Sequence, residues 1–152
     1  MTQTEYEELA DFRYRIRRFL HFSEGAAHAE GLETQQHQAL LAIRAMPGTE
    51  PCTISAVARR LFLQHQSTVG LVDRLERAGL VRRAPSPADG RQVLVALTRK
   101  GDSVLKRLSL THHAELEIQA PELARALGAI IRRLKRNENR QSQQDAEVSG
   151  AA

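Results

Sequence analysis

The sequence predicts a mainly α-helical protein that carries one small β-hairpin. Two short helical segments lie between residues 53 and 78, and only a few residues separate them. Two short strands follow between residues 80 and 97, and longer helical segments flank this module over residues 4–29 and 98–136. A pair of helices joined by so short a turn is a helix-turn-helix, and a hairpin that follows it is a wing. The predicted fold is therefore a winged helix-turn-helix with additional helices at both ends.

Caps and apolar spacing predict the helix-turn-helix. Thr53 is a good N-cap for the first helix, whose apolar residues recur every three to four positions. The second helix covers residues 66–78, and Gly79 follows it as the expected left-handed helix stop. The apolar positions are Ile54, Val57, Ala58 and Leu61 in the first helix and Val69, Leu71, Val72 and Leu75 in the second.

A turn signal between two apolar runs predicts the wing. Residues 80–83 and 92–97 have the composition of strands. Between them, two prolines discourage regular pairing, and Asp89-Gly90 is a strong signal for a tight turn. Residues 49–52 are a candidate for a short additional strand that pairs with this hairpin.

Positive charge is concentrated on this module. Residues 53–101 contain nine basic and three acidic side chains, a net charge of +6, whereas the whole chain carries only +4. Such a concentration is the electrostatic footprint of a polyanionic partner. An ordinary solvated surface is the alternative interpretation.

The order and spacing of motifs in this module resemble those of the MarR (multiple-antibiotic-resistance regulator) family. The resemblance rests on Ser67-Thr68-Val69, on Leu71-Val72-Asp73-Arg74-Leu75-Glu76-Arg77-Ala78-Gly79-Leu80-Val81, on Asp89-Gly90-Arg91 and on Leu97-Thr98-Arg99-Lys100-Gly101. Gly90 is a departure, because many members carry a second arginine there. The resemblance implies that the chain is a transcription regulator. It implies a homodimer whose interface is formed by the first and last helices. It also implies that this dimer binds double-stranded DNA at a pseudo-palindromic operator and acts as a repressor.

Short polar side chains surround the start of the second motif helix, which enters the major groove in DNA-binding proteins of this class. They can reach phosphates and base edges there, although Gln66 or Ser67 can equally cap the helix. Arg74 either reaches a base or a phosphate or is simply solvated. The candidates for DNA binding on this helix are Gln64, His65, Gln66, Ser67, Thr68 and Arg74.

The wing supplies the other candidates for DNA binding. Arg91 at its tip is the strongest of them, because an arginine can insert into a narrow minor groove. Asp89 can orient Arg91 or another arginine through a charge-assisted hydrogen bond. Arg82 and Arg83 are expected to contact phosphates or to face solvent.

Helical periodicity also defines the outer segments. The apolar stripe of residues 4–29 packs either on its own domain or, as the resemblance implies, in the dimer interface. Another helix is expected over residues 34–45, between the first helix and the helix-turn-helix. After Thr98, an N-cap, a helix continues to Ala120, where Pro121 is expected to start a new one. The stripes consist of Leu9, Phe12, Ile16, Phe19 and Leu20 at one end and Leu123, Leu127, Ile130, Ile131 and Leu134 at the other.

Composition predicts one cytoplasmic domain. Residues 1–136 are expected to form it, and residues 137–152, which hold few apolar side chains, to be a disordered tail. No apolar run is long enough to cross a membrane, and no secretory leader is expected. The single cysteine, Cys52, cannot form an internal disulfide, which suits a reducing compartment, and it is interpreted as structural.

A small aromatic or acyl ligand is predicted as the signal that releases DNA. The resemblance implies a pocket between the dimer helices and the motif, with candidate lining residues Phe19, Phe22, His37, Leu41 and Phe62. Apolar walls with few polar anchors suit such a compound. No metal or other cofactor and no thiol sensor are expected, because the first helix lacks cysteine and the six histidines form no evident cluster with carboxylates.

The chain is not expected to be an enzyme. It has no phosphate-binding loop, nucleophile elbow or zinc-protease motif. The alternative function is a winged helix that binds only protein, as an assembly module. That role requires neither the charge of the module nor a basic wing, and salt-dependent binding to duplex DNA separates the two.

Overall fold

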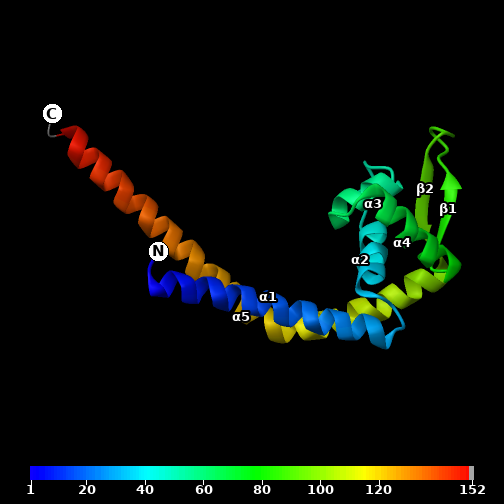
Figure 1. Cartoon of the computed structure of the whole chain (residues 1–152), viewed down its shortest axis with the longest axis horizontal. Helices are drawn as coiled ribbons and strands as arrows, with labels where there is room; N and C mark the ends of the chain where they lie inside the picture. The colour runs from blue at the N-terminus through cyan, green and yellow to red at the C-terminus, as the bar shows by residue number, and fades with distance from the viewer. Residues whose placement is uncertain (151–152) are drawn as a thin grey trace. The chain divides into compact units, whose positions relative to one another are not determined.

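The computed structural model describes residues 1–150 and shows helices with one small sheet (Figure 1). In chain order the elements are α1 (Gln3–Ala29), α2 (Thr34–Arg44), α3 (Ile54–Leu61), α4 (His65–Arg77), β1 (Val81–Pro85), β2 (Val93–Leu97) and α5 (Arg99–Gly150). This order confirms the predicted fold class. No helix in the described residues combines the length and the apolar character that crossing a bilayer requires.

Contacts divide the chain into two compact units. The terminal unit combines Met1–Phe22 with the chain from Ala114 onward, and the winged unit is Ser23–His113. Helices α1 and α5 therefore contribute residues to both units. The single domain expected over residues 1–136 stays a prediction.

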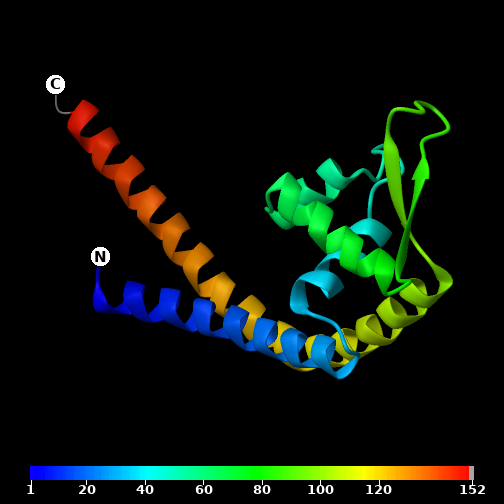
Figure 2. The same ribbon diagram turned by 45° about the vertical axis from the view of Figure 1, so that its right-hand side comes forward.

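The core of the winged unit lies where α2, α3 and α4 meet the hairpin and the first turns of α5 (Figure 2). Its most completely buried apolar side chains are Leu40, Val57, Leu71, Val72, Leu75, Val81, Val95 and Leu108. They include most of the stripe expected for the second motif helix. Burying each such side chain contributes roughly 1.5–3 kcal/mol, so this core is what holds α4 in place.

The predicted caps are present. The Thr53 hydroxyl accepts a hydrogen bond from the backbone N–H of Ala56 at 3.2 Å, and the Thr98 hydroxyl accepts one from Gly101 at 3.1 Å. Gly79 has a φ of +71°, the left-handed conformation that ends α4. These local signals fix where α3, α4 and α5 begin or end.

Strands β1 and β2 pair antiparallel, from Val81 opposite Leu97 to Pro85 opposite Val93. The segment before α3 joins them, since the N–H of Val95 donates to the carbonyl of Cys52 at 2.8 Å. An isolated bridge between Thr53 and Leu94 extends this pairing. The additional pairing expected at residues 49–52 therefore occurs at the end of that segment.

The residues that follow α4 are hydrogen-bonded to the start of α5. Lys100 Nζ donates to the carbonyl of Ala78 at 2.8 Å, and the Thr98 hydroxyl donates to that of Gly79 at 2.6 Å. At Gly101 an added Cβ would overlap the carbonyl oxygen of Leu80. Only glycine permits this close approach of the two helix ends.

The terminal unit contains ion pairs between α1 and α5. Arg133 Nε lies 2.6 Å from a carboxylate oxygen of Glu8, and Arg15 Nη1 lies 2.5 Å from one of Glu122. Several apolar side chains of this unit remain between 42% and 56% exposed, namely Leu9, Leu127, Ile131 and Leu134. One chain alone therefore leaves apolar surface on this unit.

Two predictions for α5 differ from the structure. No helix starts anew at Pro121, because α5 is continuous through it. The tail expected to be disordered continues α5 through Gly150, while residues 151–152 lie outside the described residues. The bond that Pro121 cannot donate would go to the carbonyl of Glu117, and both residues are exposed, so water can replace it. Beyond residue 137, glutamate, glutamine, arginine and alanine have adequate helix propensity.

Candidate nucleic-acid interface

The N-terminal end of α4 presents a row of exposed polar side chains. Gln64, His65, Gln66 and Ser67 are all exposed, as their predicted role requires. Thr68 is not: its side chain is fully buried and its hydroxyl donates to the carbonyl of Gln64 at 3.0 Å. The prediction that Thr68 contacts DNA is wrong, because this bond and the core occupy its side chain.

His65 connects the two motif helices. Its Nδ1 lies 3.2 Å from the hydroxyl of Ser55 in the first turn of α3. Both residues, with Arg91 and Gln92 of the wing, line an open groove of about 520 Å³. The groove therefore brings together polar side chains from α3, α4 and the wing.

The Arg74 side chain extends along α4 toward the N-terminus of the helix, where His65 lines the groove. A Cβ added at Gly70, one turn earlier, would lie 3.6 Å from Arg74 Nη1, so the guanidinium lies over Gly70. The Arg74 side chain is exposed. Its charge is thus placed on the same helix as the exposed polar row.

The wing tip is ordered by hydrogen bonds between residues two or three positions apart. Asp89 Oδ1 accepts from the backbone N–H of Arg91 at 3.0 Å, whereas the sequence predicted a bond to its guanidinium. The Ser86 hydroxyl accepts from the N–H groups of Ala88 and Asp89, each at 3.3 Å. Asp89 therefore shapes the loop and leaves the exposed Arg91 side chain free to point outward. Sequence reasoning missed Ser86, although Ser-Pro is a turn signal.

Several cations of the winged unit are engaged within it. Arg59 and Arg60 both pair with Glu50. Arg83, expected to contact phosphates or solvent, instead pairs with Asp73 at 2.6 Å and Glu76 at 2.5 Å, both on α4. Burial alone would lower the pKa of Arg83, but the hydrogen bonds that it donates to the two carboxylates raise that pKa.

Arg82 precedes Arg83 in β1 and is exposed. Successive side chains of a strand point to opposite faces, so Arg82 faces away from the carboxylates that bind Arg83. Arg74, Arg82 and Arg91 are therefore among the exposed cations that α4 and the wing offer to a partner.

The residues predicted to line a ligand pocket have diverse environments. Phe62 is the left-handed C-cap of α3 and is 97% exposed, so it is not a wall of an enclosed pocket in this chain. Leu41 is also exposed, and Phe19 and Phe22 on α1 are half-buried. Only His37 is buried, and the ligand pocket that the sequence places between dimer helices and the motif stays a prediction.

His37 belongs to a buried polar cluster within the winged unit. Its ring centroid lies 4.7 Å from that of His112, and its Nδ1 is buried without a hydrogen-bond partner. His112 Nε2 lies 2.8 Å from the hydroxyl of Ser23, and His112 Nδ1 lies 2.7 Å from the carbonyl of Leu108. Burial, and secondarily the neighbouring His112, lowers the pKa of His37. His37 is therefore held in its neutral form.

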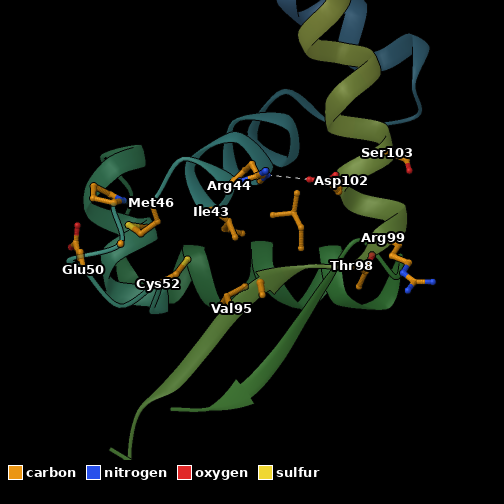
Figure 3. A pocket seen from close by; sticks show the side chains of 14 residues that line it. Ile43, Arg44, Met46, Glu50, Cys52, Val95, Thr98, Arg99, Asp102 and Ser103 are labelled. Carbon is orange, nitrogen blue, oxygen red and sulfur yellow. Dashed lines mark hydrogen bonds and ion pairs between the residues drawn. The ribbon is translucent and has the colours of Figure 1, made fainter. Parts of the chain in front are cut away.

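A larger open groove, of about 780 Å³, lies beside β2 (Figure 3). Ile43 and Val95 contribute apolar surface, and an ion pair of 3.1 Å between Arg44 and Asp102 lies along it. Cys52 also lines it, and burial raises the pKa of this thiol. A protonated thiol is a poor nucleophile, which favours the structural interpretation of Cys52. Among the described residues, no three His, Cys, Asp or Glu side chains form a group that could hold a metal ion.

These features define a class of protein. The chain is a winged helix-turn-helix protein whose α4 and wing expose polar and basic side chains, while a core and a set of ion pairs fix both elements.

Comparison with known proteins finds similarity to the MarR family over part of the chain. A model of the MarR family matches residues 30–92. The transcriptional activatory protein BadR of Rhodopseudomonas palustris is 36% identical over 84 residues, which are 55% of this chain and 48% of BadR. The chain spans about half the length of the curated relatives it matches. Over residues 30–92 the chain is therefore similar to the MarR family.

Solved structures support the same fold over most of the chain. AbsC, a MarR family transcriptional regulator from Streptomyces coelicolor, is similar with a TM-score of 0.68 at 22% identity, covering 89% of this chain and 97% of AbsC. The transcriptional repressor CouR, solved bound to a 23-mer DNA duplex, has a TM-score of 0.60 at 25% identity. That similarity covers 81% of this chain and 88% of CouR.

Proposed function

We propose that this chain is a sequence-specific regulator of transcription that binds double-stranded DNA. In this proposal α4 enters a major groove and the wing enters the flanking minor groove. The observation that carries it is that His65, a member of the exposed polar row on α4, lines one groove together with Arg91 of the wing. The net charge of +6 on residues 53–101 supports the same partner. An assembly module that binds only protein is the alternative.

The proposed regulator acts as a homodimer. The terminal unit leaves Leu127, Ile131 and Leu134 of α5 largely exposed. An apolar stripe of this kind marks an interaction surface, and a second copy of the same stripe would cover it. Two-fold symmetry then implies a pseudo-palindromic operator with half-sites about 10 base pairs apart.

Binding to a selected duplex tests this proposal. Duplexes are enriched from a random pool by the full chain, and affinity is then measured across a range of salt concentrations. The proposal expects specific binding that weakens steeply with salt. Arg91→Ala is expected to cost about 1–3 kcal/mol of binding free energy, with the larger loss at A·T-rich flanks. A chain that binds no duplex at low salt, but retains a protein partner, is instead an assembly module.

Regulation is proposed to follow the family pattern of repression with release by a small organic ligand. The half-buried Cys52 thiol, whose pKa is raised by burial, is poorly suited to sense oxidants. A ligand that binds a dimer with wrongly spaced α4 helices lowers DNA affinity tenfold if its differential binding is about 1.4 kcal/mol. CouR is described as a repressor and BadR as an activatory protein, so the sign of regulation requires its own measurement.

Two assays test the regulatory part. Transcription from a promoter that carries the selected operator shows repression or activation directly. DNA release is measured against aromatic acids and acyl thioesters, against zinc with chelator, and against peroxide with reductant. Release by zinc or peroxide that is lost in His37→Ala or Cys52→Ser, without any response to organic compounds, would contradict the ligand class.

A further inference from the structure

Arg83 joins the base of the wing to α4. From β1 its Nη2 lies 2.6 Å from Asp73 Oδ1, and its Nη1 lies 2.5 Å from Glu76 Oε2. The backbone N–H of Arg83 also donates to Glu76 Oε1 at 3.2 Å. A planar guanidinium that holds two carboxylates has a fixed geometry, which a single flexible ion pair lacks. We call these three residues the wing clamp.

Burial distinguishes the wing clamp from an ordinary surface contact. The Arg83 side chain is 23% exposed, although its two partners are 47% and 40% exposed. An isolated surface ion pair contributes little, but several charges in one network with good geometry contribute more. The neighbouring Arg82 is exposed on the opposite face of β1 and provides a natural comparison.

The wing clamp also changes the charge that α4 presents. Asp73 and Glu76 are the two acidic residues of this helix. Left unpaired, they would repel phosphates beside Arg74. Pairing with Arg83 offsets one of these two negative charges and holds both carboxylates against its guanidinium, so less negative charge remains beside Arg74.

We infer that Arg83 is a positioning residue for DNA binding, which holds the wing in a fixed orientation to α4 and contacts no phosphate itself. This inference rests on the proposed DNA binding. In that proposal α4 and the wing enter different grooves, so both can engage only when their spacing matches the duplex. Fixing this spacing before binding removes an ordering cost from the association.

The variant Asp73→Asn/Glu76→Gln gives the sharpest test, because two explanations predict opposite results. If the carboxylates merely place negative charge near DNA, their removal strengthens binding. The positioning role predicts instead that the full chain binds the selected duplex about three- to tenfold more weakly. Fluorescence anisotropy at fixed salt measures this difference.

Arg83→Gln separates positioning from phosphate contact. We expect about three- to tenfold weaker binding, with an unchanged slope of log affinity against log salt. A phosphate-contacting arginine would instead lower that slope by about 1 when replaced. Combining Arg83→Gln with the carboxylate variant should add little further loss, since all three residues belong to one network.

Amide hydrogen exchange of the free protein gives a readout that does not require DNA. Arg83→Gln should speed exchange in β1 and β2, whereas Arg82→Gln removes the same charge from the opposite face and should not. Arg83→Lys keeps the charge but cannot hold both carboxylates through a planar fork, so it should lie between wild type and Arg83→Gln. Circular dichroism verifies that each variant is folded.

The outcomes distinguish this inference from the proposed function. A wild-type chain that binds no duplex overturns the proposed function, and the positioning role with it. Duplex binding by the wild type, together with unchanged or tighter binding by the carboxylate variant, overturns the positioning role alone. A salt slope lowered by about 1 in Arg83→Gln would do the same, because it assigns a phosphate contact to Arg83.

Discussion

The winged unit and the terminal unit use the same helical spacing of apolar residues with opposite results. In the winged unit, Leu71, Val72 and Leu75 of α4 are at most 1% exposed. In the terminal unit, Leu127 and Ile131 of α5 are 42% and 43% exposed. The difference is whether the chain supplies its own covering layer, as α2, α3 and β1 do for α4. The comparison teaches that an apolar stripe identifies a packing face without identifying what packs on it.

The largest effect is expected from charges placed in the stripe of the terminal unit. Replacing Ile16 and Ile131 together with aspartate should abolish the proposed dimer, because a buried unpaired charge is very costly. Sedimentation at micromolar concentration should then give monomers or unfolded chains. The wild type is expected to sediment as a dimer. A monomeric wild type would contradict the proposal that a second copy covers the apolar stripe of the terminal unit.

A large effect is also expected in the core of the winged unit. Leu75→Ala removes a fully buried side chain and should lower the free energy of unfolding by about 2–5 kcal/mol. Leu110→Ala in the same unit removes an exposed side chain and should change it by less than about 0.5 kcal/mol. Urea unfolding measures both, and equal losses would show that exposure does not separate the two positions.

A pH-dependent effect is expected from His37. Burial and the neighbouring His112 lower its pKa in the folded state, whereas the unfolded value is about 6.5. Neutral His37 therefore contributes its full share of stability above about pH 6.5, and this share is lost as the pH falls below that value and through the lower pKa of the folded state. The free energy of unfolding should decrease from pH 7 to pH 5, and His37→Leu should reduce that slope. His113→Leu, at an exposed position, should keep the wild-type slope.

The smallest effect is expected from the ion pair beside the open groove. Arg44 and Asp102 are 66% and 57% exposed, and exposed pairs contribute about 0.2–1 kcal/mol. Arg44→Ala should therefore shift the urea midpoint only slightly, and less at high salt. A shift as large as that of Leu75→Ala would assign this pair a role in the core of the winged unit.

Local signals allowed most of the fold to be predicted. Thr53 and Thr98 cap helices through their own side chains, and Gly79 takes a left-handed conformation that few other residues tolerate. Each of these features depends on residues only a few positions apart. For the same reason, the exposed polar row at the start of α4 could be located before its surroundings were known.

Long-range contacts could not be predicted in this way. The role of Arg83 depends on how β1 lies against α4, so its carboxylate partners could not be identified from spacing alone. Thr68 was assigned to the surface because it is polar, yet it lies at helical spacing from Leu71, Val72 and Leu75. This helical spacing places Thr68 on the apolar face of α4, and it could have predicted that the side chain is buried. For Pro121, exposure of the affected backbone decides the outcome, and exposure depends on tertiary structure.

The close approach at Gly101 has a mechanical consequence. With the carbonyl of Leu80 directly against it and Lys100 bonded to Ala78, the end of α4 and the start of α5 have no slack between them. At Gly101 no side chain larger than hydrogen fits between the start of α5 and the backbone at Leu80. A movement of the first turn of α5 would therefore act directly on the backbone at Leu80, just beyond the end of α4.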